Sequence, residues 1–165
     1  MITANDWIEQ LSLKPHPEGG YYREVYRADE YIEKQALPNR YNGDRSFSTA
    51  IYYLLTAGEF SAFHRVRSDE TWHFYAGGVL EIFTINPQGS IDIKLLGNGN
   101  SNASPMHTIP HGSWFAAKPA ENTPYTLAGC TVAPGFDFAD FELADKNKLL
   151  KEFPQHKELI SALTL

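Results

Sequence analysis

The feature that most constrains the fold is a succession of short extended segments between Tyr21 and Val132, separated by turn-forming residues. Aromatic and β-branched residues recur within these segments, as is typical of β-strands. We predict nine strands, over residues 21–27, 47–55, 60–66, 71–75, 79–85, 91–95, 106–109, 114–118 and 125–132. Because no helical pattern separates these segments, the sequence predicts an all-β sandwich or barrel.

Helical patterns occur only near the two ends of the sequence. Thr3 is placed to cap a first helix, with Asp6 three residues later as the acidic member of a capping box. Residues 144–153 and 155–163 both show apolar residues at helical spacing. We therefore expect one domain over residues 1–165, with a barrel core at about 20–141 and C-terminal helices at about 144–163.

Composition narrows the classes of partner. The formal net charge is −6, which disfavours a nucleic-acid partner. Cys130 is the single cysteine, so neither an intrachain disulfide nor a cysteine-based zinc cluster is expected. No leader-like segment or apolar run of membrane-spanning length is recognised in the sequence, so we expect no membrane association and a cytoplasmic location.

Strand alternation groups the polar residues of the central stretch into faces. His64 lies on one face of its strand, and Glu70 shares a face with Trp72, opposite His73 and Tyr75. Because only a short turn separates the two strands, we expect His64 and Glu70 to face each other across a hairpin. His16 lies beside prolines in a terminal segment, where we expect a surface position.

The spacing of this stretch resembles a known motif. Gly58, His64, Glu70 and Gly77 stand at the intervals of the first cupin motif, G-x5-H-x-H-x3-E-x6-G, with Val66 in place of its second histidine. The second cupin motif is matched at Pro110 and Gly112, but Phe115 replaces its histidine. Three further segments, at residues 18–23, 64–73 and 130–136, are similar to the fifth cupin family, a domain of unknown function.

The resemblance implies a cupin-type jelly-roll barrel, or double-stranded β-helix, with short N- and C-terminal helices. It also implies a homodimer in which the N-terminal strand crosses to the partner. A typical cupin metal site uses three histidines and one carboxylate. Here only His64 and Glu70 remain as metal ligands, an incomplete set, so we expect no resident cofactor, with a divalent metal as the alternative.

Three functions are consistent with this resemblance, and whether the protein is an enzyme stays open. The first is a sugar or nucleotide-sugar isomerase or epimerase, with His64 and Glu70 as the proton-transferring pair and Tyr75 returning the proton. The second is a non-catalytic protein that binds a small molecule, and the third is a metal-dependent oxygenase. The candidate ligands are a carbohydrate and a nucleotide-sugar, and the residues we expect to contact the ligand are Tyr21, Arg23, Tyr52, Trp72, His73, Phe115 and Lys118.

Overall fold

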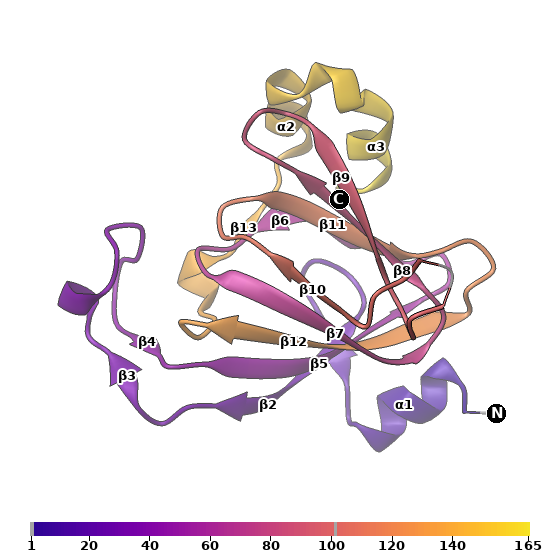
Figure 1. Cartoon of the computed structure of the whole chain (residues 1–165), viewed down its shortest axis with the longest axis horizontal. Helices are drawn as coiled ribbons and strands as arrows, with labels where there is room; N and C mark the ends of the chain where they lie inside the picture. Colours follow the sequence, from indigo (N-terminus) through magenta and orange to yellow (C-terminus); the bar gives the residue numbers. More distant parts are fainter. Residues whose placement is uncertain (1, 101) are drawn as a thin grey trace.

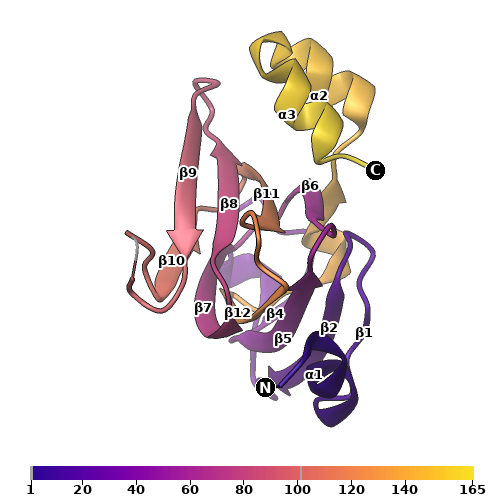
Figure 2. The same cartoon turned by 90° about the vertical axis from the view of Figure 1, so that its right-hand side faces the viewer.

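The computed structural model describes residues 2–100 and 102–165 and shows two antiparallel sheets packed face to face (Figures 1 and 2). The six-stranded sheet has the order β1-β2-β5-β12-β7-β10. Its strands are β1 (Lys14–Pro15), β2 (Tyr21–Arg27), β5 (Thr49–Thr56), β12 (Tyr125–Ala133), β7 (Asp69–Gly77) and β10 (Met106–Ile109). The five-stranded sheet comprises β13 (Glu142–Leu143), β6 (Ser61–Arg65), β11 (Trp114–Pro119), β8 (Leu80–Ile85) and β9 (Ile91–Leu96), in that order.

All nine predicted strands are present, each with ends within two residues of those expected. The architecture confirms the predicted all-β class, since turns rather than helices connect the strands. Residues 28–45 contain only short elements: β3 (Tyr31–Ile32), a 3-10 turn (Lys34–Ala36) and the first residue of β4 (Arg45–Ser46). β3 and β4 pair with each other at one end of the molecule (Figure 1).

The terminal helices are also confirmed. Thr3 caps α1 (Ala4–Gln10), and its side chain and that of Asp6 form the expected reciprocal capping box. Near the other end, Asp145 caps α2 (Lys146–Glu152). A 3-10 turn (Pro154–His156) then leads into α3 (Lys157–Ala162). No helix of the described chain is long and apolar enough to cross a membrane.

The apolar side chains form layers on both sides of the five-stranded sheet. Between the two sheets, Trp72 and Phe115 are buried with aliphatic residues of both sheets. On the outer side, Phe63 and Trp114 pack against α2 and α3. α1 covers part of the outer face of the six-stranded sheet, over Leu54 and its neighbours. The core between the two sheets therefore contains both aromatic and aliphatic side chains. It does not fill the whole space between the sheets, and a cavity remains there.

One prediction about the central stretch is wrong. β6 and β7 do not form a hairpin: β6 pairs with β11 and β13, whereas β7 pairs with β12 and β10. The turn between them carries the chain from one sheet to the other, as strand order in a jelly roll requires. His64 and Glu70 still line one space, but they do so from opposite sheets.

Candidate functional site

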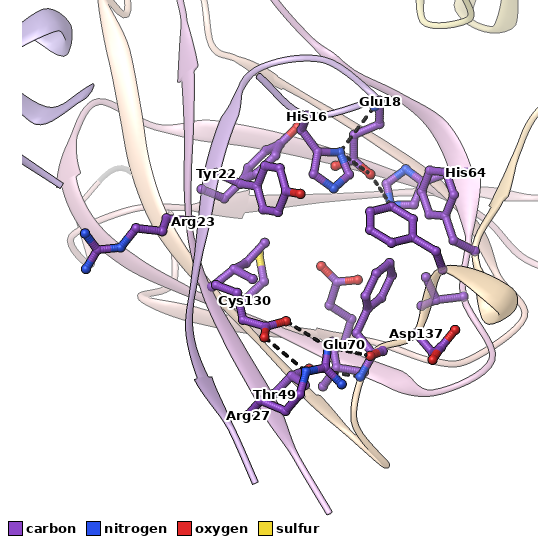
Figure 3. Close-up of a pocket in the computed structure, with 18 of the residues that line it drawn as sticks. His16, Glu18, Tyr22, Arg23, Arg27, Thr49, His64, Glu70, Cys130 and Asp137 are labelled. Atoms are coloured by element: carbon purple, nitrogen blue, oxygen red, sulfur yellow. Dashed lines mark hydrogen bonds and ion pairs between the residues drawn. The ribbon is translucent and has the colours of Figure 1, made fainter. Parts of the chain in front are cut away.

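A cavity of about 450 Å³ lies between the two sheets (Figure 3). Strands β2, β5, β7 and β12 form one wall, and β6 with the segment after β12 forms the other. Its polar lining includes His16, Glu18, Tyr22, Thr49, His64, Glu70 and Cys130. Its aromatic lining includes Phe136, Phe138 and Phe141. The cavity therefore combines buried titratable groups with a flat apolar side, as small-molecule sites commonly do.

Glu18 is the centre of a hydrogen-bonded network on one side of the cavity. Its Oε1 accepts a hydrogen bond from Ser61 Oγ at 2.8 Å, and its Oε2 lies 3.2 Å from His64 Nε2. Glu18 and His64 are only 5% and 2% exposed. Two glycines that follow allow this placement: Gly19 has a φ of 113°, and a Cβ there would collide with the Phe60 carbonyl oxygen.

Both ring nitrogens of His64 face oxygen atoms of the protein. Nδ1 lies 2.7 Å from the Ala62 carbonyl oxygen, which only accepts, so Nδ1 carries a proton. Nε2 lies 3.2 Å from Glu18 Oε2, close enough for an ion pair when the ring is protonated. Both nitrogens of His64 are thus occupied by protein groups, and neither is free for a ligand in this arrangement.

His16 presents the opposite case. Its Nδ1 accepts a hydrogen bond from the Glu18 backbone N–H at 3.2 Å, so the neutral ring carries its proton on Nε2. Nε2 points toward the middle of the cavity (Figure 3). Burial lowers the pKa of His16, although the charge of Glu18 opposes this effect. The ring packs edge-on against Tyr22 at 4.5 Å between centroids. His16 therefore offers the cavity a neutral N–H donor.

Glu70 lies on the opposite wall, in less polar surroundings. Burial, and then the charge of Glu18, raise the pKa of Glu70 to about 8. The Cys130 thiol and the Trp72 indole lie near the carboxyl group and lower its pKa by less. The indole Nε1 itself forms no hydrogen bond of normal geometry within the described chain. Glu70 is consequently protonated at neutral pH, and it loses its proton at a pH only slightly above neutral.

Basic side chains border the opening of the cavity. Arg27 forms an ion pair with Glu24 at 2.8 Å and also donates to the Phe136 carbonyl oxygen at 3.0 Å. Lys14 Nζ lies 5.3 Å from the centre of the Tyr22 ring. Glu24 and Asp137 also line the cavity, so its border carries both positive and negative charge.

Strand alternation places several of the expected ligand residues on the outer face of the six-stranded sheet. Tyr21 and Tyr52 pack with the cluster under α1, and His73 Nε2 lies 2.9 Å from Thr131 Oγ1. Tyr75, expected to return the proton, is 50% exposed and contacts Tyr52. The Arg23 guanidinium borders the opening but points away from the cavity (Figure 3).

The remaining expected residues are divided between the core and the surface. Trp72 and Phe115 are buried between the sheets, and the Phe115 ring lies 4.1 Å from the His64 ring between centroids. Lys118 lies outside the five-stranded sheet, 3.5 Å from Glu81. Of the residues proposed from the sequence, Arg23, His64 and Glu70 line the cavity, and only His64 and Glu70 among these direct their titratable groups toward its interior.

Among the titratable lining residues that were not predicted from the sequence are His16 and Glu18, which contact each other, and Glu18 also contacts His64. The interpretation of His16 as a surface group is wrong, because its side chain is only 7% exposed. Glu18 was noted only as part of a family-like segment. The signal that could have found it is its position before Gly19 and Gly20, since paired glycines permit a sharp turn that sends a neighbouring side chain inward.

The donor set does not fit a typical cupin metal. No three His, Cys, Asp or Glu side chains converge within residues 2–100 and 102–165 in a way that could hold an ion. The two positions that carry histidines in the cupin motifs hold Val66, which lines the cavity, and Phe115, which packs on His64. Both nitrogens of His64 are already occupied. The chemistry proposed below for this cavity therefore uses no metal ion.

The fold and the cavity together define a jelly-roll protein with a buried small-molecule-sized site between its sheets. The chain belongs to the cupin superfamily, specifically the family described as DUF985, whose sequence model matches residues 5–144. This finding confirms the resemblance and the cupin-type fold inferred from the motifs.

Similar proteins agree with this assignment. An uncharacterized protein of Saccharomyces cerevisiae is 30% identical over 146 residues, covering 82% of this chain and 70% of the relative. A protein from Shewanella oneidensis has a TM-score of 0.89 at 37% identity, covering 100% of this chain and 99% of that chain. A hypothetical protein from Leishmania major has a TM-score of 0.89 at 34% identity, covering 99% of each chain.

A more distant likeness concerns the fold alone. Bacillus subtilis oxalate decarboxylase, an enzyme with Mn(II) centres, has a TM-score of 0.54 at 19% identity. The match covers 93% of this chain but only 38% of that longer chain. It supports the cupin architecture and carries no information about the activity of this protein.

Proposed function

We propose that this protein binds a small hydroxylated carbonyl compound, such as a sugar derivative, and moves a proton next to the carbonyl group as an isomerase or epimerase. The observation that carries the proposal is that His16 and Glu70 line one cavity and are both held neutral. Groups whose environments shift their pKa values in this way are suited to acid–base chemistry near neutral pH.

Glu70 is the group suited to carry the proton. In its carboxylate form it would take a proton from the carbon beside the carbonyl, and the C–H electron pair would move to form an enediolate. The neutral acid would then return the proton to a carbon of the enediolate, restoring a carbonyl. A carboxyl group with a pKa of about 8 exchanges readily between these two forms at physiological pH.

His16 is suited to stabilise the oxygen of the enediolate. Its Nε2–H faces the cavity, and a neutral imidazole donates a hydrogen bond without requiring a counterion. The Glu18 backbone N–H holds the His16 ring in the tautomer that this donation needs. Glu18 and His64 are thus positioning residues in this scheme, and the His–carboxylate idea is transferred from His64 to His16.

The opening of the cavity favours a substrate with an anionic group. Lys14 and Arg27 border it and could hold the phosphate of a sugar phosphate or nucleotide-sugar. Phe138 is 52% exposed there, and its ring is stacked on that of His16, 6.3 Å away between centroids. An exposed aromatic face beside cations suits a ring-bearing anionic ligand.

The second candidate is a protein that holds such a ligand without catalysis. The aromatic side formed by Phe136, Phe138 and Phe141 favours it, because this side offers contact area and no reactive group. Mass spectrometry of small molecules that copurify with the protein would support this candidate if a ligand is found and no proton exchange occurs. No observation favours the oxygenase alternative.

The proposal is tested by solvent exchange. The protein would be incubated in deuterium oxide with a panel of aldoses, ketoses, sugar phosphates and nucleotide-sugars, and followed by proton NMR. We expect deuterium at the carbon beside the carbonyl of at least one compound. Glu70→Gln should slow this exchange by at least about 100-fold, whereas Glu121→Gln, an exposed turn residue, should leave it unchanged. Equal rates in Glu70→Gln and wild type, or no exchange with any compound, would contradict the proposal.

A further inference from the structure

A second, smaller cavity of about 280 Å³ lies beside the first, and Val66 and Phe141 line both. Four segments that are distant in the sequence meet there: the loop before β4, the end of β6 with the turn to β7, the turn between β10 and β11, and residues 139–142 at the start of β13. Its charged lining consists of Arg40, Arg65, Arg67, His111, Asp140 and Glu142. In a chain with a formal net charge of −6, such a gathering of guanidinium groups is unexpected without a role.

The carboxylates around this cavity already have partners. Asp140 accepts two hydrogen bonds from the buried Arg45, each of 2.6 Å. Glu142 accepts from Arg65 Nε at 2.7 Å. At the edge, Asp69 Oδ1 accepts from the His111 backbone N–H and lies against His111 Nδ1, both at 2.8 Å. Each of these carboxylates therefore accepts its hydrogen bonds from a residue other than Arg40 or Arg67.

Among the basic residues that line this cavity, Arg40 and Arg67 are the two without a hydrogen-bonded carboxylate in the described part of the chain. Arg67 Nη1 is buried and forms no hydrogen bond there; its nearest acid is Asp140, 3.8 Å away. Arg40 donates through Nε to the Arg67 carbonyl oxygen at 2.8 Å, which leaves its terminal amino groups free to bind another group. A buried donor without a partner costs free energy, and an incoming acceptor would remove that cost.

The loop that carries Arg40 and the turn that carries Arg67 are joined by a buried contact. Tyr41, beside Arg40, is fully buried, and its hydroxyl lies 2.8 Å from Ser68 Oγ, beside Arg67. The Arg40 guanidinium also lies 5.0 Å from the centre of the Tyr41 ring. The loop and the turn are thereby fixed relative to each other, so the site is largely formed in advance.

We propose that this second cavity binds a phosphate group, either free or as a monoester, through the guanidinium groups of Arg40 and Arg67. Guanidinium groups donate in pairs to phosphate oxygens, and such charge-assisted hydrogen bonds are stronger than neutral ones. The site is separate from the proposed acid–base chemistry, because neither arginine lines the main cavity.

Isothermal titration at constant ionic strength tests this inference, with inorganic phosphate and glycerol 3-phosphate in separate titrations. We expect saturable binding of at least one probe at one site per chain, and the tighter probe identifies the free or esterified form. Arg67→Gln and Arg40→Gln should each weaken binding by about tenfold, the loss expected for a hydrogen bond to a charged group. Lys151→Gln removes one positive charge from the exposed surface of α2, at a residue that lines neither cavity, and should bind as the wild type does.

Two further variants separate this site from the main cavity. Glu70→Gln should bind both probes normally, so failure of the proposed acid–base chemistry would leave this inference intact. Loss of binding in Lys14→Gln, with binding retained in Arg67→Gln and Arg40→Gln, would place the anion at the main opening and overturn the inference. Absence of saturable binding by either probe would also overturn it. Arg40 is exposed, so its variant remains informative if Arg67→Gln fails to fold.

Discussion

The two walls of the main cavity hold the same chemical group in opposite surroundings. Glu18, on one side, accepts a hydrogen bond from Ser61 and lies against one ring nitrogen of His64, whose other ring nitrogen faces the Ala62 carbonyl oxygen. Glu70, on the other, has the Cys130 thiol and the Trp72 indole as its polar neighbours. The comparison shows that residue type alone does not assign a role: the satisfied carboxyl group maintains the site, and the poorly solvated one is suited to react.

The largest difference between the two walls should appear when Glu18 is removed. Glu18→Ala leaves His64 and Ser61 buried without their partner, which should lower the free energy of unfolding by about 3–5 kcal/mol. Denaturant unfolding at pH 7 measures this loss. Glu121→Ala, at an exposed turn, should change stability by about 0.5 kcal/mol or less. Equal effects of the two substitutions would show that the Glu18 network contributes nothing.

Glu70 should instead reveal itself through pH. Its pKa is raised from an ordinary value of 4.5 to about 8, so between these values the folded protein holds a proton that the unfolded chain releases. The free energy of unfolding should therefore fall as pH rises from about 5 to about 8, by up to about 1.4 kcal/mol per pH unit. Glu70→Gln cannot titrate and should lack this component. A difference between wild type and variant that is independent of pH would contradict the assignment.

His16 should give a smaller effect of the opposite sign. Its pKa is lowered from an ordinary value of 6.5, so its contribution to stability is fully present above that pH. As pH falls below it, the unfolded chain gains a proton first and the folded protein loses stability. His16→Phe keeps the aromatic packing and removes this component. An unchanged pH slope in the variant would show that His16 is freely solvated.

The overall architecture was predictable because it depends on local chemistry repeated along the chain. Turn residues at regular intervals defined the strands, and Thr3 with Asp6 defined the first helix. Alternation also placed Glu70 and Trp72 on the inner face of β7, opposite His73 and Tyr75, as expected. The resemblance to the cupin family added the jelly-roll class, which periodicity alone does not contain.

The site was less predictable because its contacts join residues far apart in the sequence. His64 was expected to face Glu70, but the chain crosses between sheets after β6, and Glu18 from the loop before β2 reaches His64 first. His16 is buried by Phe138 and Phe141, more than 120 residues away. No local sequence pattern predicts these long-range contacts. The paired glycines after Glu18 are a local sequence feature that accompanies one of these contacts, that of Glu18 with His64.

The measurement that tests the difference between the two carboxyl groups most directly is a pH titration by carbon NMR of protein labelled at its glutamate carboxyl carbons. The Glu70 resonance would be assigned by its absence from Glu70→Gln. Its chemical shift should titrate with a midpoint near 8, so that the carboxyl group is protonated at neutral pH. A midpoint near its ordinary value of 4.5 would show that Glu70 is a solvated carboxylate, and would contradict its proposed role as the proton carrier.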